Sequence, residues 1–153
     1  MKIFGKTLKE YLWPIKYYVL ISILVVISQY YIGLPLSGRY PWFLNLTQAL
    51  WALMIVLSVL KLVTNYNFNM KNVLFLGVLY SIIIHGLKAF FFRVFLFPYP
   101  EIETQPLFEY VFGRPMGRFL YGSFLVMFIT IVSGIIFIGM RKKKILKEKS
   151  KKS

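Results

Sequence analysis

Four long apolar stretches, separated by short polar segments, dominate the pattern of hydrophobic and polar positions along the chain. A helix needs about 20 mainly apolar residues to cross a hydrocarbon core of about 30 Å, and each stretch reaches that length. We therefore predict spanning helices at residues 15–34, 41–63, 72–97 and 118–140. The predicted fold class is an all-α membrane protein, an antiparallel bundle of four transmembrane helices with short interfacial helices.

Prolines mark the predicted helix boundaries. Pro14 and Pro41 suit the first turn of a helix, where a missing N–H leaves no hydrogen bond unmade. The Pro-Tyr-Pro sequence at 98–100 ends the third span, because proline cannot continue the hydrogen-bond ladder. Residues 106–112 combine a proline start with apolar and aromatic side chains, and residues 1–13 alternate basic with apolar groups. Both patterns predict helices lying in the membrane interface.

The composition favours one membrane domain. Hydrophobic residues make up 58% of the 153 residues and the mean hydropathy is +0.66, which leaves too little polar surface for a soluble domain of this size. We expect a single four-span transmembrane domain at 1–140 and a basic tail at 141–153. The tail is almost wholly charged beyond Arg141, so it cannot bury an apolar face, and its pattern predicts helix only near the membrane and disorder beyond.

Positive charge is concentrated beside the spans. The formal net charge is +14, which in a soluble protein would suggest nucleic acid, but basic clusters next to spans mark the cytoplasmic side and meet anionic lipid headgroups there. With both termini cytoplasmic, that side collects fourteen of the 19 Lys and Arg residues: four before residue 17, two between 61 and 71, and eight after 140. We predict a multi-pass protein of the cell membrane with this orientation and no nucleic-acid partner.

Three ionisable residues fall inside the third span: His85, Lys88 and Arg93. At about 100° per residue, Lys88 lies about 60° from His85 and Arg93 about 80° away on the other side, so one broad face holds all three. One interpretation is structural, with Lys88 and Arg93 extending to an aromatic interface. The other is a binding site for an anion, a lipid headgroup or a partner's carboxylate, since ionisable groups within spans are expensive and often functional.

The second span offers Gln48 and Trp51, which share a helix face with Thr47. Hydrogen bonding between helices explains such residues, and a polar substrate path is the alternative. His85 alone is also a candidate for contacting a haem or a quinone. Because it is the only histidine, a bis-histidine haem within one chain is excluded.

The sequence lacks the residues that several kinds of catalysis and metal binding require. The chain has no cysteine and no aspartate, and none of the predicted spans contains a glutamate. No metal-ligand set, catalytic triad or phosphate-binding loop is apparent. We therefore expect no enzyme activity, no cofactor and no metal site.

The first functional hypothesis is a non-catalytic accessory, scaffold or assembly subunit that acts by association with a membrane-protein partner or as a homo-oligomer. The second is a small oligomeric transporter, channel or lipid carrier for an anionic solute. The third is a membrane anchor that contacts haem or quinone. The observation that separates the second from the first is whether Lys88 and His85 face a hydrated cavity.

Overall fold

The computed structural model describes residues 2–36 and 38–150, and within them every regular element is a helix. Four helices are long and apolar enough to cross a membrane, which suggests a membrane protein: Leu8–Leu36, Pro41–Asn65, Met70–Leu96 and Leu107–Glu148. The all-α class and the four helices of spanning length predicted from the sequence are confirmed.

The first long helix is interrupted twice. It begins after Thr7, whose hydroxyl accepts the Glu10 N–H while the Glu10 carboxylate accepts the Thr7 N–H, a capping box that satisfies two free donors. A π-helical turn precedes Pro35, which lacks an N–H and crowds the carbonyl of the preceding turn. The segments in order are α1 (Leu8–Leu12), η1 (Trp13–Ile15), α2 (Lys16–Ser28), η2 (Gln29–Gly33) and α3 (Leu34–Leu36).

The second and third long helices follow with little interruption. α4 spans Pro41–Asn65 and starts at a proline, as predicted. α5 spans Met70–Tyr80, where Asn69 and Asn72 cap each other's backbone N–H groups. The chain then continues as a π-helix, η3 (Ser81–Leu96), which the regular α-helical geometry assumed from the sequence did not foresee.

The last third of the chain holds two short helices and one long one. η4 (Pro100–Glu103) and α6 (Leu107–Phe112) lie in the connecting loop, and α6 falls where the sequence predicts a short helix. α7 spans Arg114–Ser150, so the tail is helical through residue 150, whereas the sequence predicted helix only near the membrane and disorder beyond. Lys, Ile, Leu and Glu favour helix, and extending an existing helix avoids the cost of nucleation. Residues 151–153 of the predicted disordered tail lie outside the described residues.

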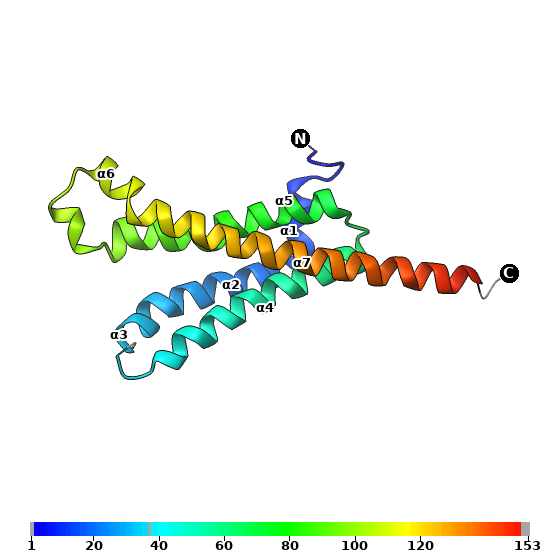
Figure 1. Cartoon of the computed structure of the whole chain (residues 1–153), viewed down its shortest axis with the longest axis horizontal. Coiled ribbons are helices and arrows are strands. Elements are labelled where there is room, and N and C mark those ends of the chain that lie inside the picture. The colour runs from blue at the N-terminus through cyan, green and yellow to red at the C-terminus, as the bar shows by residue number, and fades with distance from the viewer. Residues whose placement is uncertain (1, 37, 151–153) are drawn as a thin grey trace.

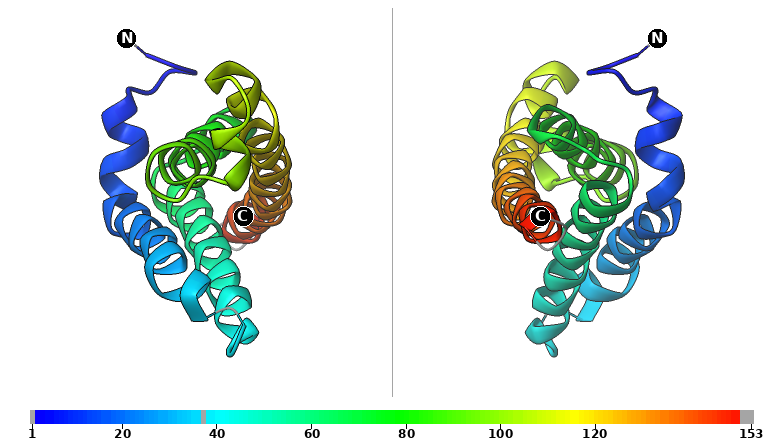
Figure 2. Two further views of the ribbon diagram at one scale, coloured as in Figure 1. Left: turned by 90° about the vertical axis from the view of Figure 1, so that its left-hand side faces the viewer. Right: turned by 90° about the vertical axis from the view of Figure 1, so that its right-hand side faces the viewer.

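The long helices form two neighbouring pairs (Figure 1). In the first pair, α2 packs against α4; in the second, α5 and η3 pack against α7, and α4 also contacts α7. The α3 turn and α6 lie at one end of the molecule, while the N-terminal segment, the α4–α5 turn and the emerging tail lie towards the other (Figures 1 and 2). We call these the loop end and the tail end.

Helices approach closely near the tail end. A Cβ atom added to Gly134 of α7 would lie 2.7 Å from Val73 Cγ1 of α5, so only glycine allows this separation. Ser58 of α4 and Tyr80 at the end of α5 are both buried and their hydroxyls lie 2.6 Å apart. A glycine at a close helix contact and a hydrogen bond between two uncharged hydroxyls therefore connect the helices in this half.

Candidate functional site

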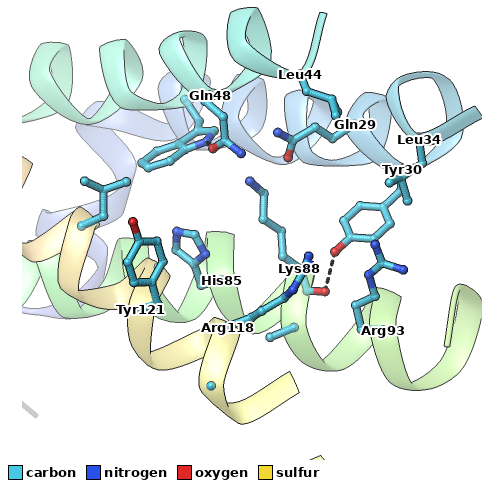
Figure 3. A pocket seen from close by; sticks show the side chains of 15 residues that line it. Gln29, Tyr30, Leu34, Leu44, Gln48, His85, Lys88, Arg93, Arg118 and Tyr121 are labelled. Atoms are coloured by element: carbon cyan, nitrogen blue, oxygen red, sulfur yellow. Dashed lines mark hydrogen bonds between the residues drawn. The ribbon is translucent and has the colours of Figure 1, made fainter. Parts of the chain in front are cut away.

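A cavity of about 550 Å³ separates the two helix pairs in the half of the molecule nearer the loop end. Its walls come from η2, the start of α3 and α4 on one side and from η3 and α7 on the other. Figure 3 shows its polar side chains converging from η2, α4, η3 and α7. They are Gln29, Tyr30, Gln48, Trp51, His85, Lys88, Arg93, Arg118 and Tyr121.

All five site residues proposed from the sequence line this cavity: Gln48, Trp51, His85, Lys88 and Arg93. Two helices that are far apart in the sequence therefore contribute to one space. Lys88 and His85 both line it, whereas its hydration, which the hypotheses turn on, stays a prediction. That these residues bind a ligand stays a prediction.

The π-helical geometry of η3 changes how its cations are arranged. In a π-helix each N–H bonds to the carbonyl five residues earlier, as the Phe97 N–H does with the Phe92 carbonyl at 2.6 Å. Residues five apart therefore lie closer together around the helix axis than they do in an α-helix. Arg93 follows Lys88 by five residues, so both cations line the same cavity, and π-helical turns are frequent at functional sites.

Lys88 is held against an aromatic ring rather than an acid. Its Nζ lies 5.4 Å from the centroid of the Trp51 ring, and Trp51 Nε1 donates to Gln48 Oε1 at 2.6 Å. In Figure 3 the Lys88 ammonium points towards Gln29 and Gln48. Among the described residues, no hydrogen bond or ion pair to Lys88 Nζ is found. The ammonium is thus placed in the cavity and left available.

Two guanidinium groups lie at the loop end of the cavity. The guanidinium carbons of Arg93 and Arg118 lie 4.4 and 5.2 Å from the centroid of the Tyr99 ring, so one ring contacts both cations. Tyr110 fixes this loop, because its hydroxyl donates to the Arg93 carbonyl and accepts the Tyr99 N–H at 2.9 Å. Arg118 comes from α7 and was not among the predicted site residues.

His85 forms the floor of the cavity by packing. Its ring meets the Trp51 ring edge to face, with centroids 5.6 Å apart. A Cβ on Gly122 would lie 2.0 Å from His85 Nδ1, so the glycine of α7 makes room for the imidazole. Within residues 2–36 and 38–150, buried His85 Nε2 has no hydrogen-bond partner. The ring is thus held between α4 and α7 with one edge along the cavity.

Tyr30 closes one wall. Its hydroxyl donates to the Lys88 carbonyl at 2.8 Å, and its ring stacks on Phe92 with centroids 4.3 Å apart and an interplanar angle of 8°. Tyr30, like Gln29, Arg118 and Tyr121, was missed as a site residue. Its signal in the sequence was weak, since an aromatic residue near a helix end is read as an interface anchor.

The cavity carries positive charge without an acidic counterpart. Lys88, Arg93 and Arg118 line it, and among the described lining residues there is neither aspartate nor glutamate. The one ion pair found within residues 2–36 and 38–150 lies outside the cavity, between Arg114 and Glu101 at 2.7 Å. The arrangement provides several hydrogen-bond donors and cations for an anion.

Comparison with known proteins gives no guide to function, because no protein-family model, curated protein or solved structure matches this chain. The fold and the cavity together define a class: a small protein with four helices of spanning length and a cationic cavity between two helix pairs.

Proposed function

We propose that the protein is a non-catalytic, multi-pass protein of the cell membrane that binds an anionic ligand in the cavity between its helix pairs. The observation that carries the proposal is the convergence of Lys88, Arg93 and Arg118 on a cavity whose described lining holds no carboxylate. Gln48 and Trp51 position Lys88, while Tyr99 positions the two arginines.

The energetics call for a further partner for the Lys88 ammonium. A charged side chain at the centre of a membrane helix costs about 2.5–3.5 kcal/mol on insertion scales. A cation–π contact such as that of Lys88 with Trp51 returns about 0.5–2 kcal/mol. The difference is met by water or by an anion in the cavity, and an anion also satisfies the neighbouring guanidinium groups.

The cavity is a one-sided pocket rather than a pore through a single chain. Towards the tail end the helices close: a Cβ on Gly77 would lie 2.7 Å from Met127 Sδ, and one on Gly134 would lie 2.7 Å from Val73 Cγ1. Val126 and Thr130 of α7 are fully buried between these levels. This packing supports a binding function, because a solute cannot pass straight through.

The proposed topology is an antiparallel bundle with both termini in the cytoplasm and with α6 and the N-terminal segment in the interface. Support comes from the position of the basic residues, since the N-terminal lysines and the tail lie at the tail end. Reporters fused after residue 153 and inserted at Gln105 should then fall on opposite sides of the membrane. Finding both on one side would contradict this topology.

Association with a partner is the second candidate function, and the extended tail favours it. α7 carries Arg141, Lys142, Lys143, Lys144 and Lys147 on a helix that projects beyond the rest of the molecule (Figure 1). Such a helix suits anionic lipid headgroups or the acidic surface of a membrane-protein partner or a second copy. Purification in mild detergent, followed by identification of co-purifying proteins, tests this function separately.

Anion binding is tested with soluble probes and the fluorescence of Trp51. The exposed Trp13 and Trp42 are first replaced by phenylalanine, so that Trp51 reports alone. The purified protein is titrated in neutral detergent with inorganic phosphate and with octyl phosphate, and octanol serves as the uncharged control. A hydrogen bond to a charged group contributes about 1.5–3 kcal/mol, so Lys88→Gln should weaken binding of both phosphates about tenfold to hundredfold.

Lys61→Gln is a matched control. Lys61 also lies on a spanning helix and its Nζ stacks 5.6 Å from the Tyr18 ring, but it does not line the cavity. Its replacement should leave both affinities unchanged. Equal effects of Lys61→Gln and Lys88→Gln, or no saturable response to either phosphate, would overturn the proposed function.

A further inference from the structure

The two seams between the helix pairs differ, and the difference bears on how a ligand reaches the cavity. One seam, between η2 and η3, is closed by the stacked rings of Tyr30 and Phe92 and by the Tyr30–Lys88 hydrogen bond of 2.8 Å. Phe97 adds a third ring, 5.7 Å from Tyr30. Nothing as large as a ligand passes through this wall without separating the rings.

The other seam, between α4 and α7, is open along the cavity. Gln48 on α4 and Tyr121 on α7 both line the cavity and are exposed, Tyr121 to 78%. Leu125, one turn further along α7, is 39% exposed and also lines the cavity. The exposed rim on α7 continues into Phe124 and Phe128, an apolar surface that faces lipid in a membrane. The opening therefore leads sideways towards acyl chains.

The chemistry of the cavity changes along its length. Cations and amides gather towards the middle and the loop end, where Lys88, Arg93 and Arg118 meet Gln29 (Figure 3). Apolar Leu125 lines the cavity on the α7 side of the open seam. Ligand pockets for small molecules span about 300–1,000 Å³, so a cavity of about 550 Å³ accommodates a polar headgroup and only the first part of an attached chain.

Resting on the proposed function, we propose that the anionic ligand is a lipid whose phosphate binds Lys88, Arg93 and Arg118 and whose acyl chains leave through the seam between α4 and α7 into the bilayer. Because the seam at Tyr30 and Phe92 is closed, the lipid reaches the site from the side of α4 and α7. A phosphate group free in water shares the headgroup chemistry but does not use the apolar seam, and this difference separates the two sources.

Quenching of Trp51 by brominated lipids tests the proposal directly. Trp51 is buried at the cavity, with 1% of its surface exposed, and in the Trp13→Phe, Trp42→Phe protein it is the only tryptophan. The protein is reconstituted in phosphatidylcholine vesicles that contain increasing fractions of dibrominated phosphatidic acid or of dibrominated phosphatidylcholine. We expect half-maximal quenching at an at least fivefold lower fraction of the anionic lipid, and we expect Lys88→Gln to remove that preference.

A chemical block of the open seam provides the second arm. The chain has no cysteine, so Leu125→Cys can be modified with cyclohexylmaleimide at one position. Modification should raise the fraction of phosphatidic acid needed for half-maximal quenching at least fivefold while leaving inorganic phosphate binding within twofold. Leu120→Cys is the control, because Leu120 is exposed on α7 but does not line the cavity.

The outcomes separate the two proposals. Equal quenching by both lipids, with phosphate binding still dependent on Lys88, would overturn the lipid and leave the anion site standing. Loss of phosphate binding in parallel with lipid binding after modification of Leu125→Cys would also overturn lateral access. Absence of any Lys88-dependent response, to lipid or to phosphate, would remove both.

Discussion

The halves of the bundle on either side of His85 differ in how their helices pack and in how their polar side chains are paired. Near the tail end, glycines bring α7 against α5, and Ser58 and Tyr80 satisfy each other across helices. Near the loop end, the helix pairs separate around a cavity whose cations have aromatic neighbours but, among the described lining residues, no acid. The two hydroxyls near the tail end thus pair with each other within the chain, whereas the cations near the loop end have no acidic partner among the described lining residues.

The contrast shows which polar residues serve the fold. A buried hydroxyl pair that matches donor with acceptor specifies how two helices meet. A lysine and two arginines without a carboxylate do not specify packing, because like charges repel and gain nothing from each other's proximity. Polarity in the first half therefore stabilises the protein, and polarity in the second half forms the candidate site.

The largest expected effect on stability comes from adding a methyl group where the helices pack closely near the tail end. Gly134→Ala places a methyl group against Val73, which is fully buried and β-branched and has no space to move into. Relative to Gly139→Ala, whose Cβ would have nothing within 4 Å, we expect a loss of about 1–3 kcal/mol in unfolding free energy. Unfolding in mixed micelles at increasing SDS measures the difference. Equal stabilities would show that the helices are not in close contact there.

The same substitution beside the cavity should destabilise less, although its clash is closer. A Cβ on Gly122 would lie 2.0 Å from His85 Nδ1, but the cavity next to the imidazole gives it room to rotate. We expect Gly122→Ala to lower stability by less than about 1 kcal/mol relative to Gly139→Ala. It should also shift Trp51 emission and weaken octyl phosphate binding, because the displaced ring occupies the cavity. A larger destabilisation than that of Gly134→Ala would contradict the comparison.

Removing one hydroxyl from each half sharpens the contrast further. Tyr80→Phe leaves Ser58 bonded to the Met54 carbonyl but without its interhelical partner. Hydrogen bonds between membrane helices contribute about 0.6 kcal/mol on average, and we expect a loss of that size. Tyr30→Phe should cost no more in stability, yet it should change the anion affinity, since it frees the Lys88 carbonyl and loosens the closed seam. SDS unfolding and Trp51 titration measure the two effects in each variant.

The smallest effect is expected where the tail begins. Arg141 Nη1 donates to the Val63 carbonyl of α4 at 2.8 Å, a cation at the carboxyl end of a helix. Such contacts contribute about 0.3–1 kcal/mol, so Arg141→Gln should lower stability by a few tenths of a kcal/mol. Lys142→Gln removes a neighbouring charge without this contact and should be neutral. A stability equal to that of the Lys142→Gln protein would show that the Arg141 contact does not hold the end of α4.

Much of the fold follows from the apolar pattern. Four apolar stretches of spanning length and a proline before 107 were enough to predict four long helices and α6. The tail was the exception, because composition indicates whether a segment can bury a face but says little about a helix that extends from a stable one. The π-helical register of η3 has no signal in hydrophobic periodicity, so the sequence placed His85, Lys88 and Arg93 on one broad face without the geometry that directs them to the cavity.

The candidate site was predictable in part for the same reason. Ionisable residues inside an apolar helix are conspicuous, so the sequence alone predicts Lys88 and His85 as candidate site residues. Arg118 lies at the start of a span, where a basic residue is unremarkable, and only the packing of α7 against η3 brings it to the cavity. Tyr30 owes its position to a contact across 58 residues, which no local pattern encodes.

The length of α7 has a mechanical consequence. At about 1.5 Å per residue, its 37 residues extend about 55 Å, almost twice the thickness of a hydrocarbon core. The ten residues from Arg141 to Ser150 then form a stiff rod of about 15 Å. The last turn is thereby kept at a fixed distance from the helices around the cavity, so a tilt of α7 there would displace that turn.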